Sequence, residues 1–360
     1  MNVYLLDNNF ETIDIIDDYS SIIWTPRYYD VGDFELYLAM NRDVFEKIKC
    51  CKYLVREKDI IGENEFHNVM IPKKINIKTN AESGDYIILS GKCLKSILGQ
   101  RCIEEQTNLS GTVEGGIYNV LSDNIINPTN HARRINNFVY GTNVLDYDFS
   151  EQFELQVTGD NVGEWLSTIC KQYGYGYDIY VKNKKFIFKL YKGTDRSYKQ
   201  SINPYVVFSQ EFDNLNSSDY TEDNSNFKNV AIVAGEGEGV ERRKFTVGTA
   251  TGLERYETFV DARDISSNKG EEDEINDDDY NKMLEERGNG SLTEFQKVKN
   301  FDANIEPSTN YVINEDYFLG DIVEVVNEYG IEATSRITEI IESEDENGST
   351  TIPTFAELEV

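Results

Sequence analysis

The first third of the chain alternates apolar and polar residues in a way that predicts a β-rich region. Residues 34–39 (FELYLA) place apolar side chains at every second position, which is typical of a strand with one buried face. The apolar runs at 3–6 and 10–16 flank Asp7-Asn8-Asn9, whose residue types suit a tight turn, so these runs predict a hairpin. The same reasoning predicts further strands at 22–25, 53–58, 68–79 and 85–91.

Helical periodicity appears at three places in the first half of the chain. A short helix is expected at 43–51, with Asp43 as its N-cap. A second helix opens at Gly115-Gly116 and ends before Pro128, because proline does not continue a helix. A third helix is expected at 161–173, where apolar residues form one stripe. A hairpin then follows, built from strands at 177–182 and 185–191.

Strands are expected to dominate the rest of the chain. An acidic segment at 266–279 (SSNKGEEDEINDDD) interrupts them, and its density of like charge predicts a surface loop. A helix is expected at 279–287, ending at Gly288, and a capping box that begins at Ser291 predicts another short helix. The last strands are expected at 322–327, 331–342 and 350–358.

Together these elements predict a β-rich α+β fold, with two antiparallel β-barrel domains and a smaller α+β domain between them. The expected domains are 1–110, 111–202 and 203–360. An internal echo agrees with two related barrels, because Gly32-Asp33 and Gly320-Asp321 each precede an apolar-rich strand. Ordinary turn chemistry explains the echo equally well, since glycine and aspartate both favour turns.

The composition restricts the classes of partner. The chain has 360 residues, a formal net charge of -30 and a pI of about 4.4. Phosphate contacts need clustered Lys and Arg, so this balance argues against a protein that grips nucleic acid. The five cysteines lack CxxC spacing and indicate reduced thiols of a protein made in the cytoplasm. We expect no secretory signal and no membrane-spanning segment.

No motif in the chain predicts an enzyme. The two histidines lie far apart, and neither has a Cys or His at ligand spacing, so no zinc site is expected. A GxSxG elbow is absent. With 65 acidic residues, a chance pair of carboxylates carries no evidence for a glycosidase. We therefore expect no catalytic residues, no metal and no cofactor.

The segment 229–243 (NVAIVAGEGEGVERR) is the most unusual in the chain. Its GxGxG pattern is similar to a nucleotide-binding loop, in which a glycine turn leads from a strand into a helix that holds phosphate. Here Glu236 and Glu238 stand where phosphate would lie, and the following residues predict a strand instead of a helix. The pattern therefore does not predict a dinucleotide site.

Together with four other segments, this one resembles bacteriophage tail hub proteins, the hubs at the tip of siphophage tails, which are related to baseplate hubs of contractile tails. The other segments are VYLLDNNFE (3–11), WTPRYYDVGDFELYL (24–38), GLERYETFVDARDI (252–265) and YFLGDIVEVVNEYGIEATSRITEI (317–340). They span nearly the whole chain in the order expected for the family, which makes the match more specific than any single motif.

The resemblance implies a homotrimeric ring in which each subunit gives two tube-like barrels, so that three copies imitate a hexameric tail tube. Such a ring would sit at the virion tail tip or baseplate. It would join the tail tube or distal tail protein and the tape measure protein to a tip, spike or receptor-binding protein, with DNA only as passing cargo. The open alternatives are the hub of a contractile, bacteriocin-like injection particle and a tail-tip cell-wall hydrolase or carbohydrate-binding protein.

The resemblance also implies structural and interface residues. Glycines would let the backbone pass closely at a turn or subunit contact, and charged side chains would form an ionic network. Acids that face the channel would repel DNA. The candidate residues are Gly235, Glu236, Gly237, Glu238, Gly239, Arg242, Arg243, Arg255, Glu257, Asp261, Arg263, Asp264, Gly32, Asp33, Gly320 and Asp321.

Overall fold

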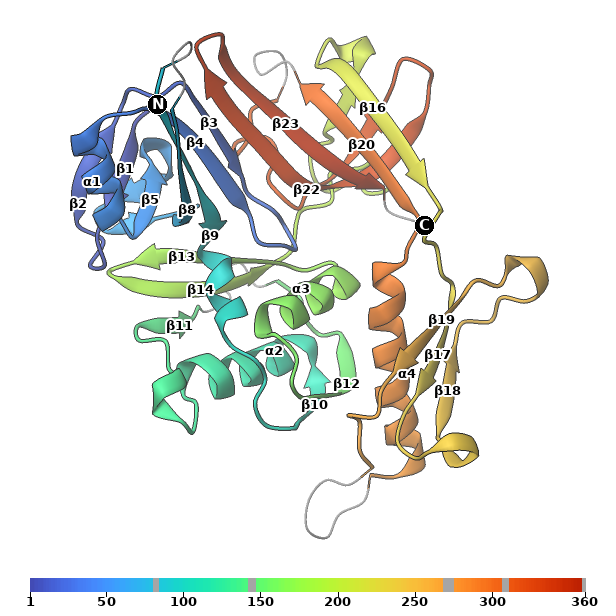
Figure 1. Cartoon of the computed structure of the whole chain (residues 1–360). Helices are drawn as coiled ribbons and strands as arrows, with labels where there is room; N and C mark the ends of the chain where they lie inside the picture. Colours follow the sequence, from blue (N-terminus) through green and yellow to red (C-terminus); the bar gives the residue numbers. More distant parts are fainter. Residues whose placement is uncertain (80–83, 142–146, 268–274, 306–310, 358–360) are drawn as a thin grey trace.

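A long, mostly antiparallel sheet forms one side of the molecule, and two smaller units lie beside it (Figure 1). The computed structural model describes residues 1–79, 84–141, 147–267, 275–305 and 311–357. The long sheet runs in the order β16 (Leu215–Asp223), β20 (Val298–Ile305), β23 (Gly348–Glu357), β22 (Glu332–Asp345), β3 (Ser21–Thr25), β4 (Asp33–Ala39), β9 (Tyr86–Cys93), β8 (Met70–Lys78), β5 (Tyr53–Arg56), β1 (Val3–Leu6) and β2 (Thr12–Ile16). Strands β15 (Val207–Ser209) and β21 (Ile322–Val326) pair beside β22.

The two ends of the chain share this sheet, because β3 pairs with β22 in antiparallel register. Trp24 lies opposite Glu342, and ion pairs add to the junction, joining Arg27 to Glu339 and Arg56 to Glu342. The predicted β-rich fold is confirmed. The predicted pair of separate barrels is not, because the described strands pair along one open path with no closed ring.

The alternation of apolar and polar residues in β4 buries one face of the strand, as predicted. Phe34, Leu36 and Leu38 are buried, whereas Glu35 and Tyr37 are only partly covered. The buried side chains pack against Trp24, which is fully buried on β3, with its ring centre 5.4 Å from that of Phe34. Burial of one face of the sheet therefore forms the core of the N-terminal half.

Helix α1 (Arg42–Cys50) lies where helical spacing predicts it, but its cap is different. Asn41 is the N-cap, and its side-chain oxygen accepts hydrogen bonds from the backbone N–H groups of Asp43 and Val44 at 2.9 and 3.4 Å. The prediction of Asp43 as the cap was wrong. Asp43 instead lies in the first turn, where its charge favours the helix dipole.

The second unit packs two helices against a five-stranded sheet. The sheet runs in the order β11 (Phe138–Tyr140), β14 (Lys185–Tyr191), β13 (Gly176–Lys182), β7 (Glu65–Phe66) and β6 (Ile60–Gly62), and β10 (Thr107–Thr112) pairs with β12 (Gln152–Val157). The helices are α2 (Val113–Leu121), extended by a π-helical turn (Ser122–Ile126), and α3 (Val162–Tyr173). Thr112 caps α2, so this helix begins two residues before the predicted Gly115-Gly116.

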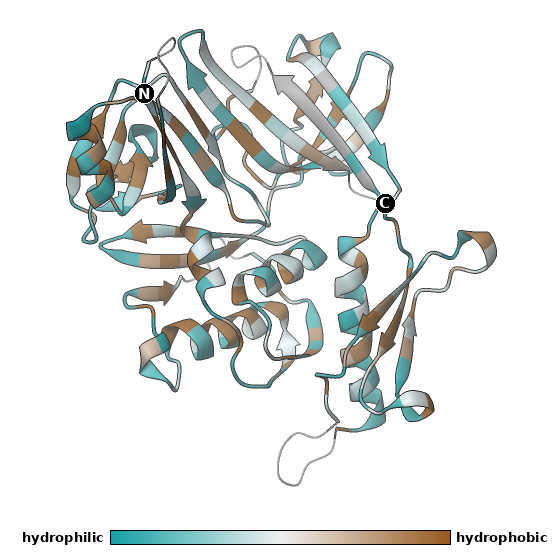
Figure 2. Ribbon diagram, in the orientation of Figure 1, coloured by the Kyte–Doolittle hydropathy of each residue, from teal (hydrophilic) through white to brown (hydrophobic). Residues whose placement is uncertain are grey.

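The third unit is a three-stranded sheet covered by one helix. Its strands are β17 (Val230–Ala234), β18 (Lys244–Val247) and β19 (Glu257–Asp261), and the helix is α4 (Asp277–Glu294). Figure 2 shows apolar residues concentrated on β17, beside α4. Ala231, Val233, Leu284 and Met283 belong to its buried core. The unit is inserted between β16 and β20 of the long sheet.

Helix α4 continues through Gly288, where the sequence predicted an end, so two predicted short helices are one. A Cβ at Gly288 would lie 2.5 Å from Cγ2 of Val247 and 2.9 Å from Cγ2 of Val233. The glycine therefore allows close packing of helix on sheet and does not act as a terminator. Part of the acidic segment predicted as a loop, 268–274, lies outside the described residues. The prediction was wrong for 277–279, because Asn276 caps α4 and these three acids form its first turn.

Candidate functional site

One face of the long sheet is incompletely covered and is called the polar face, although it also carries apolar side chains such as Ile341 and Ile352. The strand registers place Glu35 of β4 opposite Ile23 of β3 and Ser90 of β9, and Ile23 opposite Ser343 of β22. These four side chains are all partly exposed, whereas Leu36 and its neighbours on the opposite face are buried. Because side chains alternate across a strand, the same face carries Ser21, Asp33, Tyr37, Lys92, Asp345 and Thr350.

The two edges of this surface carry opposite charge. In the described residues β8 pairs with β5 only at Met70, and the exposed lysines Lys73, Lys74 and Lys78 follow along the strand. At the other edge, β16 pairs with β20 alone among the described residues. The exposed acids Asp219, Glu222 and Asp223 lie along β16. An unpaired strand edge presents N–H and C=O groups to another chain, so both edges can accept a further strand.

The predicted glycine-rich turn joins β17 to β18 and packs against α4. A Cβ at Gly235 would overlap the hydroxyl of Tyr280, which donates to Ile265 O and accepts from Glu236 N at 2.9 Å. Gly237 has a φ of +95°, a conformation that favours glycine. These glycines therefore serve a tight turn within the chain, and Gly239, with a φ of +56°, completes it.

Several predicted charged residues lie together beside this turn. Arg242 pairs with Asp261, and Arg263 pairs with the same carboxylate at 2.6 Å. Hydrogen bonds from Arg263 and Arg242 lower the pKa of Asp261 to about 2. Arg255 and Glu257 pair with each other at 2.5 Å at the opposite end of β19, so they lie apart from the cluster.

Sequence reasoning missed three residues that hold this cluster to α4. The Arg243 guanidinium lies 4.0 Å from the Tyr280 ring centre and pairs with Asp277 at 2.7 Å, as well as with the predicted Glu236 at 3.4 Å. Asp264 pairs with Arg287 of α4 at 2.7 Å. Tyr280, Asp277 and Arg287 carried no local signal, because only the folding of α4 onto the sheet brings them close.

The other predicted residues form two glycine–aspartate corners. Asp33 pairs with Arg27 at 2.8 Å and with Lys92 at 3.1 Å on the polar face of the sheet. Asp321 is almost fully buried and pairs with Arg196 at 2.8 Å. A Cβ at Gly32 would overlap the carbonyl of residue 25, and one at Gly320 would overlap a tyrosine ring. The two corners lie in different surroundings despite their similar sequence.

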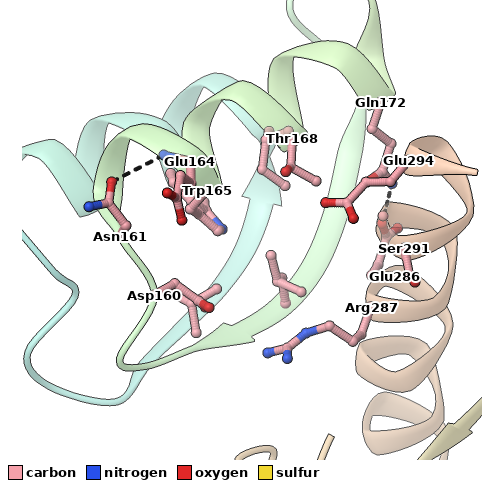
Figure 3. A pocket seen from close by; sticks show the side chains of 14 residues that line it. Asp160, Asn161, Glu164, Trp165, Thr168, Gln172, Glu286, Arg287, Ser291 and Glu294 are labelled. Atoms are coloured by element: carbon pink, nitrogen blue, oxygen red, sulfur yellow. Dashed lines mark hydrogen bonds between the residues drawn. The ribbon is translucent and has the colours of Figure 1, made fainter. Parts of the chain in front are cut away.

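A pocket lies between α3 and α4, where the second and third units meet (Figure 3). Its volume is about 330 Å³. Figure 3 shows acidic side chains from both helices facing the gap, with Arg287 reaching in from α4. The lining residues on which its chemistry depends are Asp160, Glu164, Trp165, Glu286, Arg287 and Glu294.

Two carboxyl groups in this pocket have perturbed pKa values. Burial raises the pKa of Asp160, and Arg287 only partly opposes it. Burial also raises the pKa of Glu286, although its carboxylate accepts hydrogen bonds from Gln172 at 3.0 Å and from the hydroxyl of Tyr173 at 3.1 Å. Sequence reasoning missed this pocket, because its walls come from elements more than 100 residues apart.

In the part of the chain that the structure describes, no three His, Cys, Asp or Glu side chains are grouped so as to hold a metal ion. Within the same residues, no helix has both the length and the apolar character needed to cross a membrane.

The profile of the Siphovirus ReqiPepy6 Gp37-like protein family matches residues 2–355 of the chain. No curated protein matches the sequence significantly. The matched region includes all five segments that resemble tail hub proteins, and the predicted relation to siphovirus tail proteins is confirmed.

Among the solved structures that share the fold are three tail proteins. A tail protein from Neisseria meningitidis MC58 is 14% identical with a TM-score of 0.56, and the match covers 99% of this chain and 95% of that one. The 43 kDa tail protein of prophage MuSo2 from Shewanella oneidensis is 13% identical, with a TM-score of 0.54 and coverage of 99% and 98%. Prophage tail protein gp18 from Listeria monocytogenes EGD-e is 11% identical, with a TM-score of 0.50 and coverage of 99% and 94%.

Proposed function

Since this chain belongs to the Siphovirus ReqiPepy6 Gp37-like family of siphovirus tail proteins, we propose that it forms the hub ring of the tail. Three copies surround an open axis, and the long sheets of neighbouring copies join edge to edge. In each copy the strands β16, β20, β23 and β22 act as one tube-like half, and β3, β4, β9 and β8 act as the other. Three copies then imitate the six subunits of a tail tube.

The observation that carries this proposal is the strand direction at the two edges. Every pairing from β16 through β20, β23, β22, β3, β4 and β9 to β8 is antiparallel, so β8 runs opposite to β16. Rotation about a common axis preserves the direction of each strand. The β8 edge of one copy therefore meets the β16 edge of the next as a regular antiparallel pair, and the ring closes.

Charge supports the same pairing. The exposed lysines of β8 at one edge would face the exposed acids of β16 at the other, in a chain that is otherwise strongly acidic. Like-charged edges would repel, whereas unlike edges favour one register and head-to-tail closure. This arrangement also removes the exposed edges that would otherwise invite aggregation.

In this ring the polar face of the sheet lines the channel, and DNA passes as cargo. Lys74, Lys78 and Lys92 lie on this face toward the β8 edge, where the neighbouring copy would bring the acids of β16. Over the rest of the face, serine, threonine and acidic side chains offer no basic cluster that would hold phosphate, so this part of the lining lets DNA slide. Glu35 and Asp345 lie on this face. Replacing both with lysine should slow DNA ejection from assembled particles, and ejection at the normal rate would remove this part of the proposal.

Each end of the ring would contact a different set of tail proteins. One end would seat on the tail tube or distal tail protein and surround the tape measure protein, and the other would carry the tip, spike or receptor-binding proteins. The role is structural and places the ring at the tail tip. The third unit extends from the sheet and presents the exposed apolar side chains of Val240 and Leu253 as contacts, while the ionic cluster beside Gly235–Gly239 keeps it rigid.

The test measures solution mass together with charge reversal at each edge. The unaltered chain should form a trimer. Reversing the lysines of β8 (K73E/K74E/K78E) should shift it to monomer, as should reversing the acids of β16 (D219K/E222K/D223K). The six-substitution chain should regain the trimer, because the charges are again complementary.

A triple variant at exposed lysines away from the edge, K49E/K52E/K185E, controls for the change in net charge and should remain trimeric. A monomer of the unaltered chain at all concentrations, even in the presence of tail tube protein, would contradict the hub ring. A trimer that survives reversal of either edge would place the contact elsewhere.

A further inference from the structure

The pocket between α3 and α4 has no role in the proposed ring, yet it is formed by residues of two separate units. Leu155, Val157 and Ile169 provide an apolar wall, and carboxylates lie at its rim. A volume of about 330 Å³ is equivalent to about eleven waters at ~30 Å³ each. The cavity therefore has room for a long side chain with part of its backbone.

The charge of this pocket is unbalanced. Four acids line it, Asp160 and Glu164 from the α3 side and Glu286 and Glu294 from α4. Arg287 is the basic residue of the lining, and its guanidinium is already paired with Asp264 at 2.7 Å. The raised pKa values of Asp160 and Glu286 show that burial disfavours the charged forms of these carboxyl groups. A cation that entered the pocket would stabilise the charged forms.

An unsatisfied hydrogen-bond donor gives independent evidence. Trp165 is 93% buried in the pocket lining, and its indole N–H has no hydrogen-bond partner in the described part of the chain. In Figure 3 the nitrogen end of this ring points toward the gap between the helices. A buried polar group without a partner costs free energy, so an acceptor brought by a ligand would be stabilised here.

We propose that this pocket binds a lysine or arginine side chain carried on a segment of a partner protein. The cationic head lies among the carboxylates, the aliphatic stem lies against the apolar wall, and a backbone carbonyl of the segment accepts from the Trp165 N–H after a small movement of the ring. Because the two walls come from different units, the bound segment holds the third unit against the second.

Two other kinds of ligand fit less well. An anion would meet the four acids, and Arg287 is already paired. A metal ion needs at least three closely grouped ligands, and the described residues hold no such group. A free amine would satisfy the carboxylates but would leave the Trp165 donor without an acceptor.

The experiment uses the full chain labelled with 5-fluorotryptophan. The chain has two tryptophans, so fluorine NMR gives two signals, and W165F identifies the one in the pocket. The probes are the capped tripeptides acetyl-Gly-Lys-Gly-amide and acetyl-Gly-Arg-Gly-amide, with acetyl-Gly-Leu-Gly-amide and butylammonium as comparisons. The Lys and Arg peptides should shift the Trp165 signal saturably, whereas the Leu peptide should not.

The variant E164Q/E294Q should weaken binding of the Lys peptide by about five-fold, since Glu164 and Glu294 are exposed and an ion pair to an exposed carboxylate contributes modestly. E285Q is the matched control on α4, because Glu285 is exposed and does not line the pocket, and it should leave binding unchanged. The absence of a saturable shift would overturn the proposal. So would equal binding of the Leu peptide, or binding of butylammonium as tight as that of the Lys peptide. None of these outcomes depends on the ring.

Discussion

Asp33 and Asp321 each follow a glycine and each pair with an arginine, but their surroundings differ. The side chain of Asp33 is 37% exposed and shares its charge with Arg27 and Lys92 on the polar face of the sheet. Asp321 is 2% exposed and accepts hydrogen bonds from Arg196 at 2.8 Å, Thr194 N at 2.7 Å and Phe318 N at 3.1 Å. Water reaches the carboxylate of Asp33, whereas the carboxylate of Asp321 receives its hydrogen bonds from protein groups.

The two corners also differ at their glycines, because Gly320 lies against a buried side chain that contacts another unit. Gly320 has a φ of +98°, and a Cβ there would overlap the ring of Tyr28, which is fully buried. A Cβ at Gly176 would overlap the same ring, so Tyr28 lies between two glycines from different units. Its hydroxyl accepts from Gly193 N at 3.0 Å. The Gly320-Asp321 corner therefore joins the units, whereas the Gly32-Asp33 corner belongs to the sheet surface.

A short motif that occurs twice in the sequence therefore does not have the same role at both places. Both corners begin a strand, β4 and β21, because glycine and aspartate suit a tight turn. The difference in burial decides how strongly each corner depends on its hydrogen-bond and ion-pair partners. Water can replace a lost partner at Asp33, but nothing replaces one at Asp321.

The largest expected effect is at the buried corner. Asp321→Ala leaves the Arg196 side chain, 14% exposed, without its carboxylate, and leaves two backbone N–H groups without an acceptor. We expect a loss of about 3–5 kcal/mol in the free energy of unfolding. Urea unfolding followed by fluorescence measures it. A loss below 1 kcal/mol would mean that the two corners are equivalent.

The second prediction separates backbone strain from steric overlap. Gly320→Ala should cost about 2–4 kcal/mol, because it combines a positive φ with overlap on the Tyr28 ring. Gly330→Ala is the matched control, since its φ is +74° and nothing lies within 4 Å of the added Cβ. It should cost only about 1 kcal/mol. Thermal unfolding compares the two, and equal losses would show that the ring contact contributes nothing.

The third prediction concerns the exposed corner. Asp33→Ala should lower the free energy of unfolding by less than about 1 kcal/mol, because Arg27 keeps its pairing with Glu339 and the remaining charges are solvated. The same urea titration used for Asp321 measures it. A loss as large as that of Asp321→Ala would abolish the distinction between the corners.

The smallest effect is the pH dependence of the Asp33 contribution. Burial alone would raise the pKa of Asp33, but the hydrogen bonds and charges of Arg27 and Lys92 outweigh burial and lower it. A carboxyl group whose pKa is lowered in the folded state stabilises the folded protein at pH values above its unfolded pKa of about 3.9. This stabilisation is lost as the pH falls through the pKa of the folded state. The small difference between the unaltered chain and Asp33→Asn should therefore be constant from pH 6 to 5 and shrink below pH 4. A difference that grows toward low pH would contradict the assignment.

Local patterns in the sequence were sufficient for much of the secondary structure. The alternation in residues 34–39 predicted β4 because a half-buried strand imposes a period of two. The apolar stripe at 161–173 predicted α3, and its C-cap is Gly174 in the left-handed conformation. The family resemblance rested on residues spread along nearly the whole chain, which is why it also held.

The positions at which sequence reasoning failed depend on distant contacts. Helix α4 continues through Gly288, where Val233 and Val247 leave no room for a side chain, and no local pattern shows that this glycine serves packing instead of ending the helix. Arg243 was predicted to join an ionic network, but its partners Asp277 and Tyr280 became neighbours only when α4 folded onto β17.

Neighbouring residues and composition were enough to predict many of the strands and helices, the acidic charge and the family. The pairing of β3 with β22, the opposite charges at the two edges of the sheet, and the burial of one glycine–aspartate corner but not the other became visible only in the folded chain. The free energy of burial and the pairing of charges depend on which residues meet in space, and the residues that meet between β3 and β22 lie more than 300 positions apart in the sequence.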